Sequence, residues 1–230
     1  VDPESDACIF YTSGTTGFPK GAQLTHRGCV ANLFNMLYAA ASSALAVERA
    51  TGVAPPATPP VPVTLVTTPL FHVTANNCAA YGVTAAGGAL VLMYRWDAGD
   101  ALKIIERERV TGMSGVPIMA RELINHPDFP NTNTSSLLAL SGGGAQVPPD
   151  QVLKIDEAVE TARPTTGYGM TETCGIITSL GGDFYVDRPD SAGPAMPVYE
   201  AKCVDDDGSE VPLGETGELW VRGAAVIKGY

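Results

Sequence analysis

The sequence predicts an α/β fold: a mainly parallel sheet flanked by helices, with a short antiparallel β section at the C-terminal end. Between residues 63 and 172, short β-prone runs alternate with helical ones, as βαβ crossovers require. From residue 201 onward, Asp-Gly and Gly-Glu turns separate short β-prone runs, which is typical of antiparallel hairpins. We therefore expect an α/β core over residues 1–200 and a β-hairpin section of the same domain over residues 201–230.

Each element follows from its local pattern. The segment "DACIFYT" (6–12) is apolar and β-prone, which predicts a buried strand. Thr25 can cap a helix that ends near Glu48 and whose predicted apolar face is Val30, Leu33, Phe34, Leu37, Ala41 and Ala44. The Pro-rich segment 51–62 is an expected loop. The remaining expected elements are a strand at 63–68, a helix at 76–86, a strand at 88–94, a helix at 100–110 capped by Asp100, a strand at 111–115, a helix from Pro117, a strand at 137–144, a helix at 149–162 and a strand at 164–172.

Composition and charge exclude several classes of protein. The 230 residues are 45% hydrophobic and 17% charged, as in soluble globular proteins. The net charge of −11 argues against nucleic acid or an anionic membrane as a partner. The apolar stretches 63–73 and 87–96 are too short to span a bilayer, and the acidic start is unlike a signal peptide. The five cysteines form no CxxC pair or Cys/His cluster, so we expect reduced thiols in a cytoplasmic protein without a zinc site.

The segment "YTSGTTGFPKG" (11–21) carries three glycines, four Ser/Thr hydroxyls and one lysine. Glycine lets successive backbone N–H groups turn inward into an anion-binding nest, to which hydroxyls and a lysine add donors. A di- or triphosphate requires such a loop. The Walker A pattern does not fit, because Pro19 stands where its second glycine must be and Gly21 replaces its Ser/Thr.

Two further glycine-bearing loops follow predicted strands, "SGGGA" (141–145) and "TGYGMTE" (166–172). Ligands of open parallel sheets bind at the carboxyl ends of the strands. We therefore expect these two loops and the segment 12–17 to converge on one site.

Five ordered motifs resemble the adenylate-forming superfamily, which contains acyl- and aryl-CoA synthetases, luciferases and adenylation domains. They are "YTSGTTGFPKGAQLTH", "PLFH" (69–72), "SGGGA", "GYGMTE" (167–172) and "GELWVRGAAVIKGY" (217–230), and "SAGPAMP" lies between the last two as in the family. The resemblance covers essentially the whole chain. It favours the acyl-CoA synthetase branch, specifically the ATP-binding core of its large N-terminal domain.

The resemblance implies roles for individual residues. The β- and γ-phosphates of ATP would be held by Thr12, Ser13, Gly14, Thr15, Thr16, Gly17 and Lys20. Adenine would lie between Gly143, Gly144 and Ala145 on one side and Tyr168 on the other, with Gly169 and Met170 completing the loop. Small residues let the backbone approach a flat base, and an aromatic ring stacks on it. Thr171 would bond the α-phosphate and Glu172 would hold Mg²⁺, a hard cation suited to one or two carboxylates.

In acyl- and aryl-CoA synthetases, the histidine of "PLFH" lies at the carboxylate pocket, which implies that role for His72. Amino-acid-activating relatives carry an aspartate in this region, so His72 after Phe71 favours an acid without an amino group. Asn76, Val116 and Met170 are expected walls of the pocket. Fatty-acid relatives often have glycine where this chain has Ala75, which leaves the pocket shape open.

The implied reaction is attack of a carboxylate on the α-phosphorus of ATP, followed by displacement of AMP by the thiol of CoA. A fatty acid is the expected substrate, and Lys20, His72, Thr171 and Glu172 are the expected catalytic residues. The alternatives are an amino-acid adenylation domain and a catalytically silent binding fragment. Full members of the family extend further at both ends. An N-terminal subdomain completes the acyl pocket, and a ribose-binding Asp, a hinge and a C-terminal domain with an essential Lys follow the last motif. We therefore expect a central piece of an enzyme, whose missing domains are its partners and which binds nucleotide without turnover.

Overall fold

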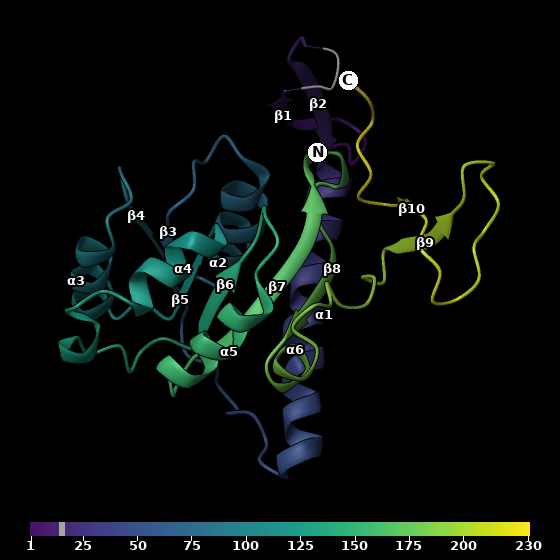
Figure 1. Cartoon of the computed structure of the whole chain (residues 1–230). Helices are drawn as coiled ribbons and strands as arrows, with labels where there is room; N and C mark the ends of the chain where they lie inside the picture. Colours follow the sequence, from purple (N-terminus) through teal and green to yellow (C-terminus); the bar gives the residue numbers. More distant parts are fainter. Residues whose placement is uncertain (14–16) are drawn as a thin grey trace.

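The structure is a computed structural model that describes residues 1–13 and 17–230. Its centre is a six-stranded sheet in the order β4-β3-β5-β6-β7-β8 (Figure 1). All neighbouring pairs are parallel except β7 and β8, which are antiparallel. The strands are β3 (Val63–Val66), β4 (Ala89–Leu92), β5 (Gly112–Gly115), β6 (Ala139–Gly142), β7 (Arg163–Met170) and β8 (Gly175–Gly181). The predicted fold class is confirmed.

The α-helices are α1 (His26–Thr51), α2 (Tyr81–Ala85), α3 (Ala98–Glu108), α4 (Pro117–Ile124), α5 (Pro149–Ala158) and α6 (Asp183–Asp187). The helices α2 to α5 lie between successive parallel strands, whereas α1 precedes β3 and α6 follows β8. A π-helical segment η1 (Thr74–Ala80) leads into α2, and η2 (Phe129–Asn131) and η3 (Thr171–Thr173) are single 3₁₀ turns. The helices α3, α4 and α5 contact one another in turn, whereas α1 contacts β8, η1 and α2. The main core lies between the sheet and α3–α5, where Leu65, Ile105, Met113 and Leu140 are buried.

The helix α1 begins as predicted, since the Thr25 hydroxyl accepts a hydrogen bond from the Gly28 amide at 3.0 Å. The predicted apolar face is wrong: Phe34 is 60% exposed, and Val30 and Leu37 also face outward. Small and polar residues form the buried face, namely Gly28, Cys29, Ala31, Asn32 and Asn35. Apolar residues occupy most of the circumference, so periodicity could not choose the face. The close approach of α1 to Cys174 sets the buried face instead, because a Cβ on Gly28 would lie 2.7 Å from the Cys174 sulfur.

By length and composition, α1 is also apolar enough to cross a membrane, a feature that the sequence analysis overlooked. Only 17% of its most apolar window is buried. Core helices of soluble proteins meet the same criteria, so this feature alone is weak evidence for a membrane.

The strand β1 (Asp6–Thr12) has the predicted bounds but not the predicted setting. It forms a separate two-stranded antiparallel sheet with β2 (Lys20–Thr25), and Phe10 is its one fully buried side chain. The strand β2 was not predicted, because its sequence "KGAQLT" is too polar and too rich in Gly and Ala to read as β-prone. The glycine-bearing segment is therefore a hairpin connection rather than a loop at the end of a parallel strand.

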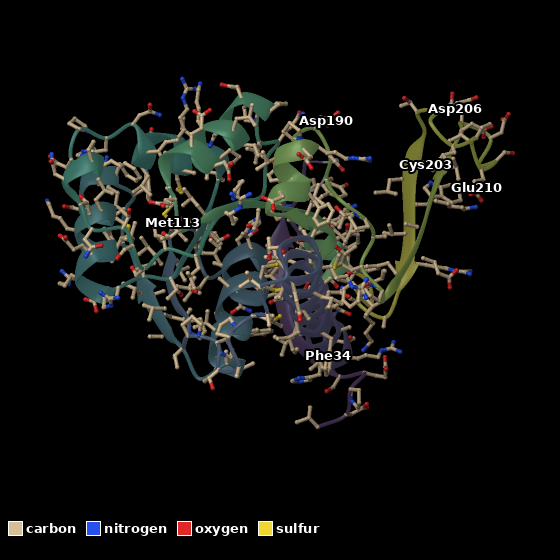
Figure 2. The ribbon with its side chains drawn as sticks, turned by 90° about the horizontal axis from the view of Figure 1, so that it is seen from below. Phe34, Met113, Asp190, Cys203, Asp206 and Glu210 are labelled. Carbon is tan, nitrogen blue, oxygen red and sulfur yellow. The ribbon has the colours of Figure 1, made fainter. Side chains whose placement is uncertain are left out.

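The cap of α3 and the strand β8 differ from the prediction, whereas the C-terminal hairpin agrees with it. Asp97, not Asp100, caps α3, and its carboxylate accepts a hydrogen bond from the Asp100 amide at 2.9 Å. The strand β8 was not predicted. The strands β9 (Tyr199–Val204) and β10 (Glu218–Gly223) form the expected antiparallel hairpin. Asp206 and Glu210 lie at its outer end, away from the main sheet (Figure 2).

Candidate functional site

The parallel strands β3, β5, β6 and β7 all end at one edge of the sheet. Most of the predicted site residues follow these ends, as expected for an open α/β sheet. His72 and Asn76 come after β3, Val116 directly follows β5, Gly143–Ala145 follow β6, and Tyr168–Glu172 lie at the end of β7.

The β1–β2 hairpin supplies the predicted phosphate loop. Thr12 pairs with Lys20 in the last register position of the hairpin, so both residues stand where the loop begins and ends. Gly17 has a φ of +90°, a conformation that residues with a side chain rarely adopt. Ser13 is exposed. Gly14, Thr15 and Thr16 lie outside the described residues.

Lys20 and Glu172 come together through the last residue of the chain. The Tyr230 hydroxyl donates a hydrogen bond of 2.6 Å to Glu172 Oε1. The Lys20 ammonium lies 5.1 Å from the centroid of the Tyr230 ring. The backbone amide of Ile227 also donates to the Glu172 carbonyl at 2.9 Å. The structure therefore places the predicted phosphate lysine and the predicted metal carboxylate on either side of one tyrosine.

A tight turn fixes the segment that carries Thr171 and Glu172. Gly169 lies at a bulge in the β7–β8 pairing, where a Cβ would be 1.9 Å from the Gly175 carbonyl oxygen. Only glycine fits such an approach. Thr173 is buried, and its hydroxyl donates to the carbonyls of Met170 and Gly175, each at 3.0 Å. The turn is therefore held from within, before any ligand is considered.

Two buried asparagines tie this turn to the rest of the molecule, and sequence reasoning missed both. Asn77 on η1 donates to the Cys174 carbonyl at 2.9 Å. Asn32 on α1 accepts from the Ile176 amide at 2.9 Å and donates to the Asn77 carbonyl at 3.2 Å. A buried amide must be hydrogen-bonded, so these residues act as positioning groups. The available signal for Asn32 was its place between Val30 and Leu33 in a predicted amphipathic helix.

Thiols lie beneath the same turn. Cys29 and Cys174 are buried, and Cys8 is partly buried. A hydrogen bond with the Cys174 thiol, together with burial, raises the pKa of Cys29 to about 11. Cys29 is therefore neutral at physiological pH and behaves as a small apolar side chain.

The predicted adenine residues form an open surface. Gly144 has a φ of +74°, and no atom lies within 4 Å of the position that its Cβ would take. The amide of Gly143 donates to the Gly115 carbonyl at 3.1 Å, and Ala145 is exposed. Tyr168 is 42% exposed, so its ring is available for stacking and is not a core aromatic.

The predicted acid-binding residues lie at the start of η1 and α4 and at the end of β7. His72 is exposed, and its Nδ1 accepts a hydrogen bond from the Thr74 amide at 3.2 Å, which fixes the ring at the start of the helical turn. Asn76 donates to the Asn77 side-chain oxygen at 3.0 Å. Val116 is half-buried at the N-cap of α4, and Met170 is 38% exposed.

The donor set for a metal is small. Among the described residues no cluster of three or more His, Cys, Asp or Glu side chains could hold an ion. Glu172 offers one carboxylate, with Oε1 bonded to Tyr230. Mg²⁺ is often bound through one or two carboxylates, with substrate phosphates and water completing the shell. The Glu172 carboxylate therefore fits Mg²⁺ carried by a nucleotide.

Two hollows in the described surface do not coincide with this edge of the sheet. One is lined by residues of α4 and α5, including Asn125 and Lys154. The other lies behind β2 and is lined by Thr25, Arg27 and Ile227 among others. Neither hollow is lined by a predicted site residue.

The fold matches solved structures of adenylate-forming enzymes. One is o-succinylbenzoate coenzyme A synthetase from Bacillus subtilis in complex with ATP and magnesium ion, with a TM-score of 0.78 and 30% identity. The match covers 100% of this chain and 43% of that chain. The parallel sheet thus has the fold of the adenylate-forming enzymes.

The chain belongs to the AMP-binding enzyme family, which it matches over residues 1–230. A feruloyl-CoA synthase from Amycolatopsis is 35% identical over 227 residues, covering 98% of this chain and 42% of that protein. A long-chain-fatty-acid–CoA ligase from Escherichia coli is 34% identical over 233 residues, covering 99% of this chain and 38% of that protein. The chain thus spans about two fifths of the length of these relatives.

Proposed function

We propose that this chain is the ATP-binding core of an acid–thiol ligase that activates a carboxylic acid as an acyl-adenylate and passes the acyl group to CoA. The observation that supports it best is that Lys20 and Glu172 both contact Tyr230, although these two residues are 152 positions apart in the sequence. A lysine and a metal-binding carboxylate are the groups that a triphosphate bound with Mg²⁺ requires.

In this proposal the residues position phosphate charge instead of attacking the substrate. Lys20 and the hairpin residues Thr12, Ser13 and Gly17 hold the β- and γ-phosphates, and Gly14, Thr15 and Thr16 share that role by resemblance. Thr171 hydrogen-bonds the α-phosphate, and Glu172 would hold Mg²⁺, which when bound neutralises phosphate charge. The carboxylate of the substrate attacks the α-phosphorus and pyrophosphate leaves. Catalysis by alignment and charge stabilisation needs no protein nucleophile.

The residues proposed to bind adenine and the acid come from the same edge of the sheet. Adenine stacks on Tyr168 against Gly143–Ala145, with Gly169 and Met170 lining the approach. His72, Asn76, Val116 and Met170 form the acid-binding end. We propose a fatty acid as substrate, because these residues are neutral or apolar and His72 stands where amino-acid-activating relatives carry an acid.

An aryl acid is the second candidate, and the relatives support it. The feruloyl-CoA synthase is as similar to this chain as the fatty-acid ligase is. Binding of non-hydrolysable acyl-adenylate analogues separates the two candidates. A dodecanoyl analogue that binds more tightly than a feruloyl one supports the fatty acid, the reverse order supports the aryl acid, and preference for an aminoacyl analogue contradicts both.

Selective loss of ATP binding tests the nucleotide assignment. In calorimetry on the 230-residue chain with Mg²⁺, we expect Lys20→Ala to weaken ATP binding about ten- to hundredfold, because hydrogen bonds to charged groups contribute about 1.5–3 kcal/mol. The affinity for AMP, which lacks the β- and γ-phosphates, should fall far less in Lys20→Ala. Lys103→Ala, on the exposed face of α3, is the control and should change neither affinity. Equal loss for ATP and AMP, or no ATP binding by the wild type, contradicts the assignment.

We further propose that the 230-residue chain alone binds ATP without forming acyl-adenylate, because its relatives are more than twice as long. Exchange of labelled pyrophosphate into ATP, measured with a panel of carboxylic acids, checks this. A clear exchange signal would overturn it.

A further inference from the structure

The last residues of the chain lie beside β2 and pair with it at one isolated bridge. The Lys228 amide donates to the Gln23 carbonyl at 3.0 Å, and the Gln23 amide donates to the Gly229 carbonyl at 2.9 Å. Gln23 and Gly229 form an antiparallel bridge. On the other side, the Ile227 amide bonds the Glu172 carbonyl. Backbone contacts with two separate elements therefore set the place of Tyr230.

The side chain of Tyr230 contacts both charged groups of the candidate site. Its 2.6 Å bond to Glu172 Oε1 has the length typical of a hydroxyl donating to an ionised carboxylate. The Lys20 ammonium, 5.1 Å from the ring centroid, lies within cation–π range. Tyr230 is nevertheless 60% exposed, so core packing does not explain its position.

A metal-binding carboxylate needs a fixed orientation. The hydrogen bond from Tyr230 engages Oε1, so Oε2 is the oxygen left for a ligand. Partners of this kind, which touch a metal ligand but not the metal, commonly change metal affinity or activity by about 10- to 100-fold when removed.

We propose that Tyr230 is a positioning residue that orients the Glu172 carboxylate toward nucleotide-bound Mg²⁺ and holds Lys20 beside it. The inference rests on the proposed function and extends it to a residue outside the phosphate loop and the "GYGMTE" turn. The opposite role would be a block, in which Tyr230 occupies the carboxylate and must leave before Mg²⁺ binds.

Removal of one hydroxyl distinguishes the two roles. We expect Tyr230→Phe in the 230-residue chain to weaken ATP binding about tenfold with Mg²⁺ present and to leave it unchanged in EDTA. Tyr94→Phe, a fully exposed tyrosine on the loop after β4, is the matched control and should behave as wild type. An unchanged or tighter Mg²⁺-dependent affinity in Tyr230→Phe overturns the inference.

A double-mutant cycle tests whether Tyr230 acts through Glu172. Glu172→Gln should remove the Mg²⁺ dependence by itself, and adding Tyr230→Phe should then cost nothing further. Additive losses in the two variants would mean that Tyr230 does not act through this carboxylate, and would overturn the inference.

A spectroscopic measurement without nucleotide separates this inference from the proposed function. The hydrogen bond to Glu172 raises the pKa of Tyr230 above its ordinary value. In an alkaline absorbance titration, the difference between wild type and Tyr230→Phe isolates this tyrosine, and we expect Glu172→Gln to lower its pKa. If the pKa does not move, the contact and the inference fail even when ATP binds. If the pKa moves but the wild type binds no ATP, the contact stands, and the proposed function fails together with the positioning role.

Discussion

The parallel-sheet core and the proposed phosphate-binding end of the molecule, where Lys20 and Glu172 meet at Tyr230 (here the phosphate end), are defined by different kinds of contact. In the core, aliphatic side chains such as Leu65, Ile105 and Leu140 are fully buried between the sheet and α3–α5. At the phosphate end, Tyr11 and Phe18 are 76% and 82% exposed, and the contacts that define the site are polar. The core thus provides a rigid frame, while single hydrogen bonds set the geometry of the site. Substitutions should therefore separate stability from ligand binding.

The largest expected effect is on stability, in the core. Leu140→Ala should lower the free energy of unfolding by about 2–5 kcal/mol, because it removes buried methyl groups and leaves a cavity. Denaturant unfolding measures the loss, and ATP affinity measured on the folded fraction should remain that of the wild type. The control is Leu153→Ala, since Leu153 on α5 is 43% exposed. This substitution should lower the free energy of unfolding by less than about 0.5 kcal/mol. A large loss of ATP affinity in folded Leu140→Ala would contradict the separation.

A smaller loss of stability, accompanied by a loss of ATP affinity, is expected at the hydrogen bond between Asn77 and Cys174. Asn77→Ala leaves the buried Cys174 carbonyl without its amide donor, at a cost of about 1–3 kcal/mol. Because Cys174 follows the turn of Thr171 and Glu172, ATP affinity should fall as well. Thermal unfolding and calorimetry measure the two effects. In the control Asn125→Ala, an exposed helix-end amide is lost, and both quantities should stay near wild type. Loss of stability with full ATP affinity would show that Asn77 does not position the turn.

The smallest expected effect is on the pH dependence of the unfolding free energy, through the buried thiol of Cys29. Hydrogen bonding to Cys174 raises the pKa of Cys29 in the folded chain to about 11, from an ordinary value of 9.0. The folded state then retains a proton that the unfolded state loses. This contribution to stability is complete below pH 9 and is lost as the pH rises toward 11. Unfolding free energies between pH 8 and 11 should fall less steeply in Cys29→Ala than in wild type, and an identical slope would contradict the account.

Periodicity and turn chemistry predicted the frame well, because each βαβ unit carries its own local signal. The predicted strand at 111–115 and the helix opened by Pro117 match β5 and α4 closely. Local signal did not predict β2 and β8, which are antiparallel partners defined by pairing with β1 and β7. Nor could it choose the buried face of α1, which is set by contact with Cys174, far away in the sequence.

The candidate site, like the fold, could be predicted from the sequence only in part. The glycine-bearing segments and their resemblance to the adenylate-forming superfamily predict the site residues, but not the contacts between them. Asn32, Asn77 and Tyr230 contact the turn of Glu172 from distant parts of the chain, and long-range contacts leave no trace in spacing or composition.

The Mg²⁺ dependence of ATP binding tests the central claim, that Lys20 and Glu172 form the two sides of one nucleotide site. The measurement is ATP affinity of the wild type and of Glu172→Gln, each with Mg²⁺ and with EDTA. Gln keeps the size of the side chain and removes its charge. We predict that Mg²⁺ strengthens ATP binding in the wild type and that this enhancement disappears in Glu172→Gln. An enhancement of equal size in both proteins would contradict the claim.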